Sequence, residues 1–388
     1  MAIPIAYNVR SVFARPASAL ATTVGIGFTV AILVGALALA AGFQQALIRT
    51  GRDDNALVVR KSADSEISSG LTRDAVNILR AYPGIASGPD GRPLVSAEVV
   101  VLTNKPRLGQ PGSSNLTVRG IDPEALSFRE RVRVVAGRMF TPGAAEIIVG
   151  RRIVHRFAGL GIGDRIRFGQ RDFTVVGQFE AGGSGFESEV WGDNKVLMPV
   201  FRGDVFQSVT FRMKDPARFA QVQHELQSDP RLGVDVQRES DYYRAQSEML
   251  ATVIRVAGVF IVIIMAVGAV FGAMNTMYAA VGARSREVAT LLALGFRPGA
   301  ILVSFVIESV FLALLGGALG CLLALPVNGI VTSTTNFSSF SELAFAFRVT
   351  PGALLTGLAF AAVLGVVGGF LPALKAARQP LAAALRGG

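Results

Sequence analysis

The chain is organised around residues 283–296, which read Ala283-Arg284-Ser285-Arg286-Glu287-Val288-Ala289-Thr290-Leu291-Leu292-Ala293-Leu294-Gly295-Phe296 and interrupt two long apolar runs. An apolar stripe recurs here at helical spacing, made of Val288, Leu291, Leu292 and Gly295. The charged residues Arg284, Arg286 and Glu287 precede the stripe; Gly295 can close such a helix, and Pro298 prevents it from continuing. The pattern predicts a short amphipathic helix that a partner can move at the membrane surface. A basic loop that only fixes orientation is an equally weighted alternative.

Composition places the chain among membrane proteins. Hydrophobic residues make up 51% of its 388 residues, charged residues only 17%, and the mean hydropathy is +0.47, unlike a soluble domain. A membrane crossing takes roughly 20 apolar residues. Four runs are long enough: Ala17–Phe43, Val256–Ala283, Ile301–Leu325 and Pro351–Leu374. The sequence therefore predicts an α-helical membrane protein with four transmembrane helices.

Basic residues predict the orientation of these helices, because Lys and Arg near short loops stay on the cytoplasmic side. They gather at one set of ends: Arg10, Arg15, Arg284, Arg286, Arg297, Lys375, Arg378 and Arg386. We therefore expect both termini inside and residues 44–248 outside. The net charge of +10 then reflects topology, and no basic-aromatic groove or nucleic-acid motif supports nucleic-acid binding.

The expected division of the chain follows from these two patterns. The predicted segments are a cytoplasmic amphipathic leader 1–16, a first span 17–43, an extracytoplasmic domain 44–248, a stalk and second span 249–283, a cytoplasmic coupling helix and loop 284–300, a third span 301–325, an extracytoplasmic loop 326–350, a fourth span 351–374 and a cytoplasmic tail 375–388. Retention of the first run as a span is favoured over cleavage as a signal peptide, because the run is about twice as long as a signal-peptide core.

The external domain is expected to be α+β. A strand, a helix and a strand occur at Ala56–Lys61, 72–81 and Leu94–Leu102, and the same order returns between 206 and 237. Two such units predict a split ferredoxin-like layer, and the strand-rich stretch of about 103–204 between them predicts an inserted β subdomain. The single cysteine, Cys321, lies in the third span, so the external domain must fold without disulfides.

Polar residues inside the spans form a second candidate site. Glu308 lies in the third predicted span, at a depth similar to that of Asn275 and Thr276 in the second. Carboxylates inside membranes are rare and usually face a partner. We expect Glu308 to hydrogen-bond Asn275 or Thr276; ion or proton conduction is the less favoured alternative, because a second intramembrane carboxylate, Lys or His is lacking.

Catalytic, metal and cofactor signals are absent from the sequence. His155 and His224 lack metal-ligand spacing, and no G-x-x-x-x-G-K-[ST] motif is present to bind nucleotide. We expect no catalytic residue, no metal site and no cofactor.

Several short motifs carry a resemblance to a known family. The run 284–295, the pattern Leu312-x-x-x-Gly316-Gly317-x-x-Gly320 and the closing run 371–378 are similar to FtsX-like permease signatures. In the external domain the motifs are Gly137-Arg138-Met139-Phe140, Glu146-Ile147-Ile148-Val149-Gly150, Gly163-Asp164 and Val175-Val176-Gly177. These resemble the MacB-type periplasmic core, so the chain resembles the FtsX-like/MacB-type permeases of ABC transporters over nearly its whole length.

The resemblance implies a function and a set of partners. It implies a permease subunit in the cell inner membrane, driven by separate ABC ATPase subunits, paired with a second permease copy and often joined to a membrane-fusion adaptor. ATPase motion would pass through the coupling residues Arg284, Arg286, Glu287, Val288, Leu291, Leu292 and Gly295 and the second-span stalk to drive export or extrusion. Leu292 stands where many relatives carry a basic residue. The alternatives are a membrane receptor or scaffold that transports nothing, or an FtsX-like regulator of extracytoplasmic enzymes.

Overall fold

A computed structural model of the chain describes residues 16–379 except 110, 202, 337 and 338. Residues 1–15 of the predicted leader and 380–388 of the predicted tail lie outside this described part. The chain divides into two compact units. The first comprises the chain up to Ala41, Thr252–Ile330 and the chain from Phe347 onward, and the second comprises Gly42–Ala251 with Val331–Ala346.

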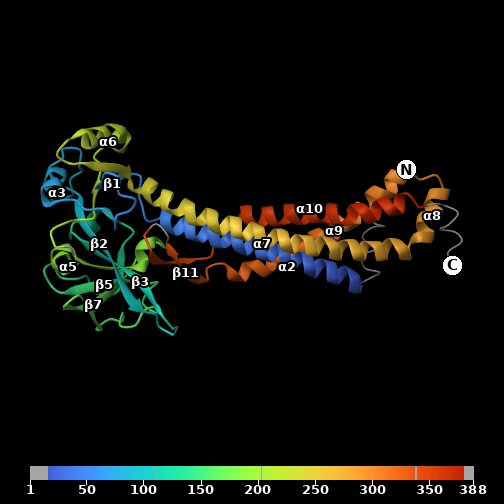
Figure 1. The fold of residues 1–388 in the computed structure, drawn as a ribbon, viewed down its shortest axis with the longest axis horizontal. Coiled ribbons are helices and arrows are strands. Elements are labelled where there is room, and N and C mark those ends of the chain that lie inside the picture. Colours follow the sequence, from blue (N-terminus) through green and yellow to red (C-terminus); the bar gives the residue numbers. More distant parts are fainter. Residues whose placement is uncertain (1–15, 110, 202, 337–338, 380–388) are drawn as a thin grey trace. The chain divides into compact units, whose positions relative to one another are not determined.

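Four long apolar helices make up most of the first unit. They are α2 (Pro16–Ile48), α7 (Glu239–Ala283), α9 (Pro298–Ala324) and α10 (Pro351–Ala377) (Figure 1). By length and composition each can cross a membrane. The expectation of four apolar membrane-crossing helices is confirmed, whereas the boundaries of the membrane-spanning parts stay predictions.

Small residues bring these helices close together. A Cβ added at Gly320 of α9 would lie 2.4 Å from the carbonyl oxygen of Gly27 in α2, and one at Gly365 of α10 would lie 2.7 Å from the Cβ of Ala313 in α9. Because only glycine tolerates such distances, these positions set how closely the helix backbones pack. The Ser309 hydroxyl adds a hydrogen bond of 2.8 Å to the Gly365 carbonyl.

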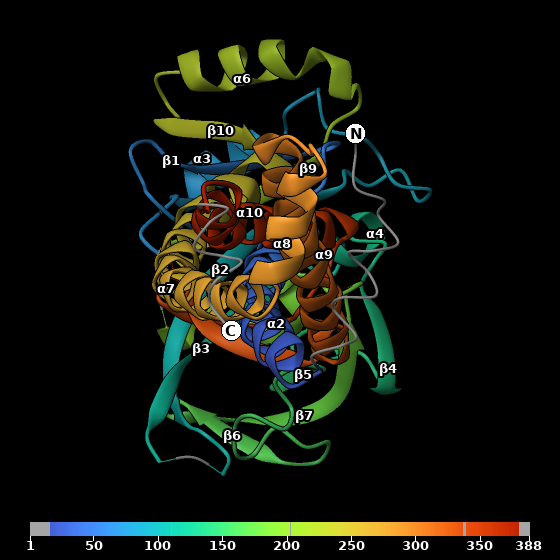
Figure 2. The same cartoon turned by 90° about the vertical axis from the view of Figure 1, so that its right-hand side faces the viewer.

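The short helix α8 (Ser285–Ala293) connects α7 to α9. Figure 2 views the molecule from the end at which α8 lies. Val288 of α8 belongs to a buried apolar cluster with residues of α7, α9 and α10, namely Met277, Val281, Ile301, Phe305, Ala373 and Ala376. The predicted helix is therefore present, and it is packed against its own bundle. The 3-10 turn η3 (Leu325–Val327) follows α9.

The second unit is built on one ten-stranded sheet. The strands run in the order β10 (Val234–Arg238), β1 (Asn55–Arg60), β9 (Ser208–Arg212), β2 (Val95–Pro106), β3 (Ser113–Ile121), β8 (Glu189–Asp193), β5 (Glu146–Gly150), β7 (Arg171–Glu180) and β4 (Arg133–Gly137), and β6 (Arg165–Phe168) pairs with β7. Among β10, β1, β9 and β2, each strand is antiparallel to its neighbours.

Two helices cover one face of those four strands. Residues two apart in each strand, such as Ala56 and Val58 of β1 or Val209 and Phe211 of β9, point to the same face. That face packs on α3 (Arg73–Arg80) and α6 (Phe219–Ser228), whose buried residues join the same core. Thr72 caps α3 by accepting a hydrogen bond from the Ala75 amide, and the turn η2 (Pro216–Arg218) leads into α6.

The remaining strands have their own apolar core but not a sheet of their own. This core contains Val118, Ile147, Val175 and Leu197, and α5 (Asn194–Phe201) contributes to it. The expected inserted β subdomain stays a prediction; the structure adds that β2 pairs with β9 on one side and with β3 on the other, so the sheet is continuous. Shorter elements here are α4 (Ala125–Phe128) and η1 (Gly185–Ser188).

The segment predicted as an external loop, 326–350, contains a hairpin. Strands β11 (Val331–Asn336) and β12 (Ser341–Ala346) pair in antiparallel fashion and belong to the second unit. The alternating Ser and Thr of β11 gave little apolar signal, which is why the sequence suggested only a loop.

Candidate functional site

The C-terminus of α8 has the geometry of a Schellman motif. Gly295 has a φ of +87°, its N–H donates to the Leu292 carbonyl at 3.1 Å, and the Phe296 N–H donates to the Leu291 carbonyl at 3.1 Å. Pro298 then occupies the first turn of α9. The prediction that Gly295 closes this helix is confirmed.

The residue before α8 is an anchor within the bundle. Arg284 is buried; its Nε lies 3.0 Å from Glu287 and its Nη1 lies 3.0 Å from Oε2 of Glu308. Its guanidinium also lies 5.3 Å from the centre of the Phe305 ring. Arg284 therefore ties the start of α8 to α9, and its contact with a partner stays a prediction.

The structure gives Glu308 a partner that the sequence analysis did not name. The expected hydrogen bond from Asn275 or Thr276 to Glu308 stays a prediction. The Thr276 hydroxyl lies 2.7 Å from the Thr22 hydroxyl and donates to the Ala273 carbonyl. Asn275 is exposed on α7. Glu308 joins α9 to the start of α8 through Arg284, and Thr276 joins α7 to α2 through Thr22.

One side of α8 packs against the helix bundle and the other side is exposed. Val288 is buried, while Leu291 and Leu292 are partly buried against the bundle. Val288 fills the chain's own core, so the contact of this stripe with an ATPase stays a prediction that depends on Leu291 and Leu292. The exposed surface instead carries Arg286, Glu287 and Leu294, the last with 70% of its area exposed.

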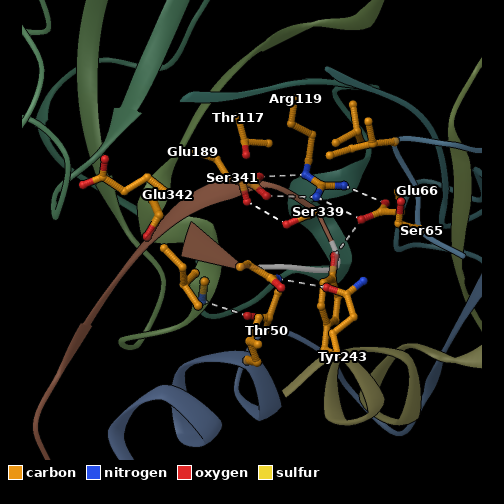
Figure 3. A pocket seen from close by; sticks show the side chains of 18 of the residues that line it. Thr50, Ser65, Glu66, Thr117, Arg119, Glu189, Tyr243, Ser339, Ser341 and Glu342 are labelled. Carbon is orange, nitrogen blue, oxygen red and sulfur yellow. Dashed lines mark hydrogen bonds and ion pairs between the residues drawn. The ribbon is translucent and has the colours of Figure 1, made fainter. Parts of the chain in front are cut away.

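The second unit contains a buried charge cluster, formed by Glu66, Glu98, Arg119, Arg129, Glu189 and Glu239. Arg119 of β3 lies at its centre and makes ion pairs with Glu66 at 2.9 Å, with Glu98 at 2.7 Å and with Glu189 at 2.7 Å (Figure 3 shows the first and third). Arg129 lies 2.5 Å from Glu98 and 3.7 Å from Glu239. Four carboxylates thus face two guanidinium groups, and all of these side chains except that of Glu189 are almost fully buried.

Burial and the neighbouring charges shift the pKa values of the carboxyl groups in this cluster. Burial raises the pKa of Glu98 and of Glu239, and the neighbouring arginines offset the rise only in part. Burial opposes ionisation of Glu66 as well, but Arg119 outweighs it and holds the pKa of Glu66 below its usual range. The carboxyl groups of the cluster therefore differ in the direction of their pKa shifts, up for Glu98 and Glu239 and down for Glu66.

The first turns of α7 are part of the same network. Oε2 of Glu239 accepts hydrogen bonds from the Asn55 side chain at 2.8 Å and from the Arg52 amide at 3.2 Å. The Tyr242 hydroxyl accepts from the Glu66 amide at 2.7 Å, and the Tyr243 hydroxyl donates to the Glu66 carboxylate at 3.2 Å. These contacts fix the start of α7 in the second unit.

A small polar cavity of about 50 Å³ adjoins the cluster. Figure 3 shows Thr50, Arg119, Glu189, Tyr243 and Ser341 around it, so the C-terminal end of α2, the start of α7 and the β11–β12 hairpin all reach this place. The hairpin is held nearby by Glu342, which pairs with Arg107 and Arg156 at 3.0 Å each. A cavity of this size and polarity suits one or a few waters. In the described part of the chain, no group of His, Cys, Asp or Glu is arranged to hold a metal ion.

Sequence reasoning did not identify this cluster. The available signal was a single charged residue inside an otherwise apolar strand, as with Glu98 between Ala97 and Val99 or Arg119 after Val118. Such a residue indicates a buried partner, but the pattern does not say which of many distant charges supplies it.

Comparison with known families covers both units. The model of the MacB-like periplasmic core domain matches residues 19–229, more than half of the chain, and the model of the FtsX-like permease C-terminal region matches residues 259–381. The chain belongs to the MacB/FtsX-type permeases of ABC transporters. The resemblance stated from the motifs is confirmed, and a MacB/FtsX-type permease is a membrane protein.

Individual relatives of this MacB/FtsX-type permease are moderately similar. A macrolide export ATP-binding/permease protein MacB of Bdellovibrio bacteriovorus is 25% identical over 93% of this chain and 58% of its own length. MacB 1 of Aeromonas hydrophila is 28% identical over 68% of the chain and 42% of its own length. A pyoverdine export ATP-binding/permease protein PvdT of Pseudomonas entomophila is 28% identical over 63% of the chain and 39% of its own length. The chain thus spans about half the length of these curated relatives.

A solved structure also matches. The extracellular domain of the noncanonical ABC-type transporter YknZ from Gram-positive bacteria is 16% identical, with a TM-score of 0.36, over 47% of this chain and 99% of its own.

Proposed function

We propose that this permease transmits the motion of ABC ATPase subunits through α8 and α7 to its external domain and so drives export. The observation that carries the proposal is α7 itself. It is one helix from Glu239, in the buried charge cluster, to Ala283, next to Arg284 and α8. A helix held at both ends by ion pairs is suited to transmit displacement between them.

ATP hydrolysis is assigned to a separate subunit. The two family models match a periplasmic core domain and a permease region, and the relatives named above combine ATP-binding and permease functions in their names. Those names also concern the export of macrolides and pyoverdine, which supports export of organic compounds by this chain.

The surface that meets the ATPase is assigned to the exposed side of α8, carrying Arg286, Glu287 and Leu294. Leu291 and Leu292 of the apolar stripe stay proposed contacts beside this surface, whereas Val288 is buried in the chain's own core. An exposed leucine beside charged residues supplies an apolar contact with a polar rim.

A second copy of the chain is proposed to pack on α7. In the most apolar stretch of α7 only 6% of residues are buried, against 33–44% in the other three spans. Gly268 and Gly272 of α7 have open space where a Cβ would be added, whereas Gly316, Gly320, Gly365 and Gly369 are all used in packing within the chain. Free small residues at four-residue spacing fit a close helix–helix contact.

Location and orientation remain as the basic residues suggest. We assign the chain to the inner membrane with both termini cytoplasmic and residues 44–248 outside, because Arg284, Arg286, Arg297 and Lys375 adjoin one set of helix ends. A membrane-fusion adaptor is a further proposed partner that rests on family resemblance alone.

The external domain is assigned a split ferredoxin-like layer. The strand order β10-β1-β9-β2 places β9 between β1 and β2, with α3 and α6 packed in one shared core. Two β-α-β units interleaved in this way support the assignment.

Co-purification tests the proposed function. The full chain is tagged and isolated from membranes of its source organism, bound proteins are identified by mass spectrometry, and ATPase activity is measured. We expect a P-loop ATPase to co-purify with wild type and to be lost from Leu294→Glu. A chain isolated with extracytoplasmic enzymes and no ATPase would favour the receptor or regulator alternative.

A further inference from the structure

The external domain contains a cavity larger than the polar one beside the charge cluster. Its volume is about 440 Å³, within the range of sites for small organic molecules. It is lined by α3, which packs in the first core of the domain, and by α5, which packs in the second. Phe206 lines the cavity and contacts both cores. Ligand sites favour such junctions, since side chains from two cores converge there.

The cavity combines an apolar wall with basic groups. Val76, Met198 and Phe206 provide the apolar part. Met198 is a suitable contact for varied ligands, because its thioether side chain is flexible and polarisable. On α3, Arg73, Val76, Asn77 and Arg80 recur at i, i+3, i+4 and i+7, so one helical face supplies both apolar and basic groups.

Two of the three cations around the cavity can bind an anion. Arg80 does not bind a ligand in this proposal, because it pairs at 2.5 Å with Asp122. Asp122 is a nearly buried carboxylate that also accepts hydrogen bonds from the Ala97 amide and the Asn194 side chain. Arg73 pairs with Asp204 at 2.7 Å, but both side chains are well exposed, so this pair is weak and exchangeable. The Lys195 ammonium has no ion-pair partner among the described residues.

We propose that this cavity binds an amphipathic small organic anion, with its apolar body against Met198 and Phe206 and its carboxylate at Lys195 and Arg73. Arginine matches a carboxylate with two parallel hydrogen bonds, and lysine adds a point charge. The site goes beyond the proposed function, and its occupancy does not depend on an ATPase partner.

Dansylglycine, an aromatic carboxylate that becomes fluorescent in apolar surroundings, is a suitable probe. It is titrated into the full chain in phosphatidylcholine nanodiscs, and the signal of empty nanodiscs is subtracted. We expect saturable binding to wild type. We expect Lys195→Gln and Arg73→Gln each to weaken it by about tenfold, the effect of one charged hydrogen bond. Both residues are exposed, so both variants should fold normally.

Three controls test whether binding depends on the charge of the probe, on the space in the cavity and on a lysine outside it. The uncharged probe dansylamide should bind at least about tenfold more weakly than dansylglycine. Asn77→Trp places a large ring in the cavity from an exposed position and should abolish binding of dansylglycine. Lys214→Gln makes the same charge change as Lys195→Gln at an exposed lysine that does not line the cavity, and it should leave dansylglycine binding unchanged. No saturable binding to wild type, or wild-type binding by Lys195→Gln and Asn77→Trp, would overturn the site. Equal binding of dansylamide would overturn its preference for an anion.

Discussion

Arg284 is held by two carboxylates with different surroundings. Glu287 is 58% exposed, whereas Glu308 is almost fully buried. An exposed ion pair contributes about 0–1 kcal/mol, because water already solvates both groups. Removing one partner of a buried pair costs more, since the remaining charge keeps its desolvation penalty. Glu308 is therefore the partner that fixes the start of α8.

Replacement of Glu308 tests this ranking. Glu308→Gln should lower the free energy of unfolding by about 1.5–3 kcal/mol, the range for a hydrogen bond to a charged group. Glu287→Gln, with the same chemical change at an exposed site, should cost less than about 1 kcal/mol. Thermal unfolding of both variants in nanodiscs measures the difference. Equal effects would mean that Arg284 does not depend on the buried carboxylate.

The pH dependence of stability tests the buried charge cluster. Because the pKa of Glu98 and that of Glu239 are raised in the folded domain, the native state holds these protons more tightly than the unfolded state. Stability should then fall as pH rises above about 4.3, the ordinary pKa of Glu, until the raised folded values are passed. Glu66, with a lowered pKa, acts in the opposite sense and loses its contribution as the pH falls through that folded value.

Melting curves between about pH 5 and pH 8 measure this decline. Glu98→Gln carries no titrating proton at that position, so its melting temperature should depend less on pH than that of wild type. Lys214→Gln serves as the control on the domain surface. A decline of the same slope in Glu98→Gln would show that Glu98 is ionised throughout.

The local sequence predicts the residue that ends α8 but not the ion pairs between distant residues. Gly295 was predictable, because a glycine after an amphipathic stripe is a local signal for a helix end, and its φ of +87° bears this out. The pairing of Arg284 with Glu308 and of Arg119 with Glu66 joins residues far apart in sequence. No local pattern identifies such partners; only the packing of elements brings them together.

At the scale of elements, α8 has one buried side and one exposed side. Leu294→Glu should weaken binding of an ATPase by about 2 kcal/mol or more, as expected for an interface anchor. Insertion and folding should be unchanged, because the Leu294 side chain is 70% exposed. The matched control is Leu108→Glu, at an exposed leucine of the second unit. Affinity is measured with the ATPase that co-purifies; wild-type affinity in Leu294→Glu would place the contact elsewhere.

The free glycines of α7 lead to a separate expectation. Gly268→Leu and Gly272→Leu should each raise the dimer dissociation constant by about tenfold or more, because a bulky side chain separates the two backbones. Energy transfer between fluorescently labelled copies in liposomes reports the association. Gly35→Leu is the control, since Gly35 of α2 also has open space around it. Loss of association in Gly35→Leu alone would move the interface to α2.

Elements were predictable where one pattern dominated. The four apolar helices follow from length and hydropathy, and helix α3 follows from its apolar face and the Pro83 stop. The β11–β12 hairpin was missed because β11 is polar and because Glu342 of β12 pairs with distant arginines of the second unit. The continuity of the sheet at β2 was missed because strand pairing is not visible in a single strand.

At the scale of the whole molecule, the proposed transmission depends on α7 remaining one helix. A proline inside a helix removes a backbone hydrogen bond and clashes with the preceding turn, at a cost of about 3 kcal/mol or more. Phe260 lies within α7 with 65% of its area exposed, so its replacement leaves the buried core of the chain unchanged. Phe260→Pro therefore breaks or kinks the helix without altering the charge cluster or α8.

We expect Phe260→Pro to bind the ATPase through α8 as wild type does and to keep its basal turnover, while export stops. Phe260→Ala, which removes the same ring and keeps the helix, should retain export. Both variants are reconstituted with the co-purified ATPase in liposomes, and binding, ATP hydrolysis and export are measured on the same preparation. Loss of ATPase binding together with export would indicate a folding defect. Normal export by Phe260→Pro would mean that α7 does not carry the motion, because a broken helix cannot transmit displacement from Arg284 to Glu239.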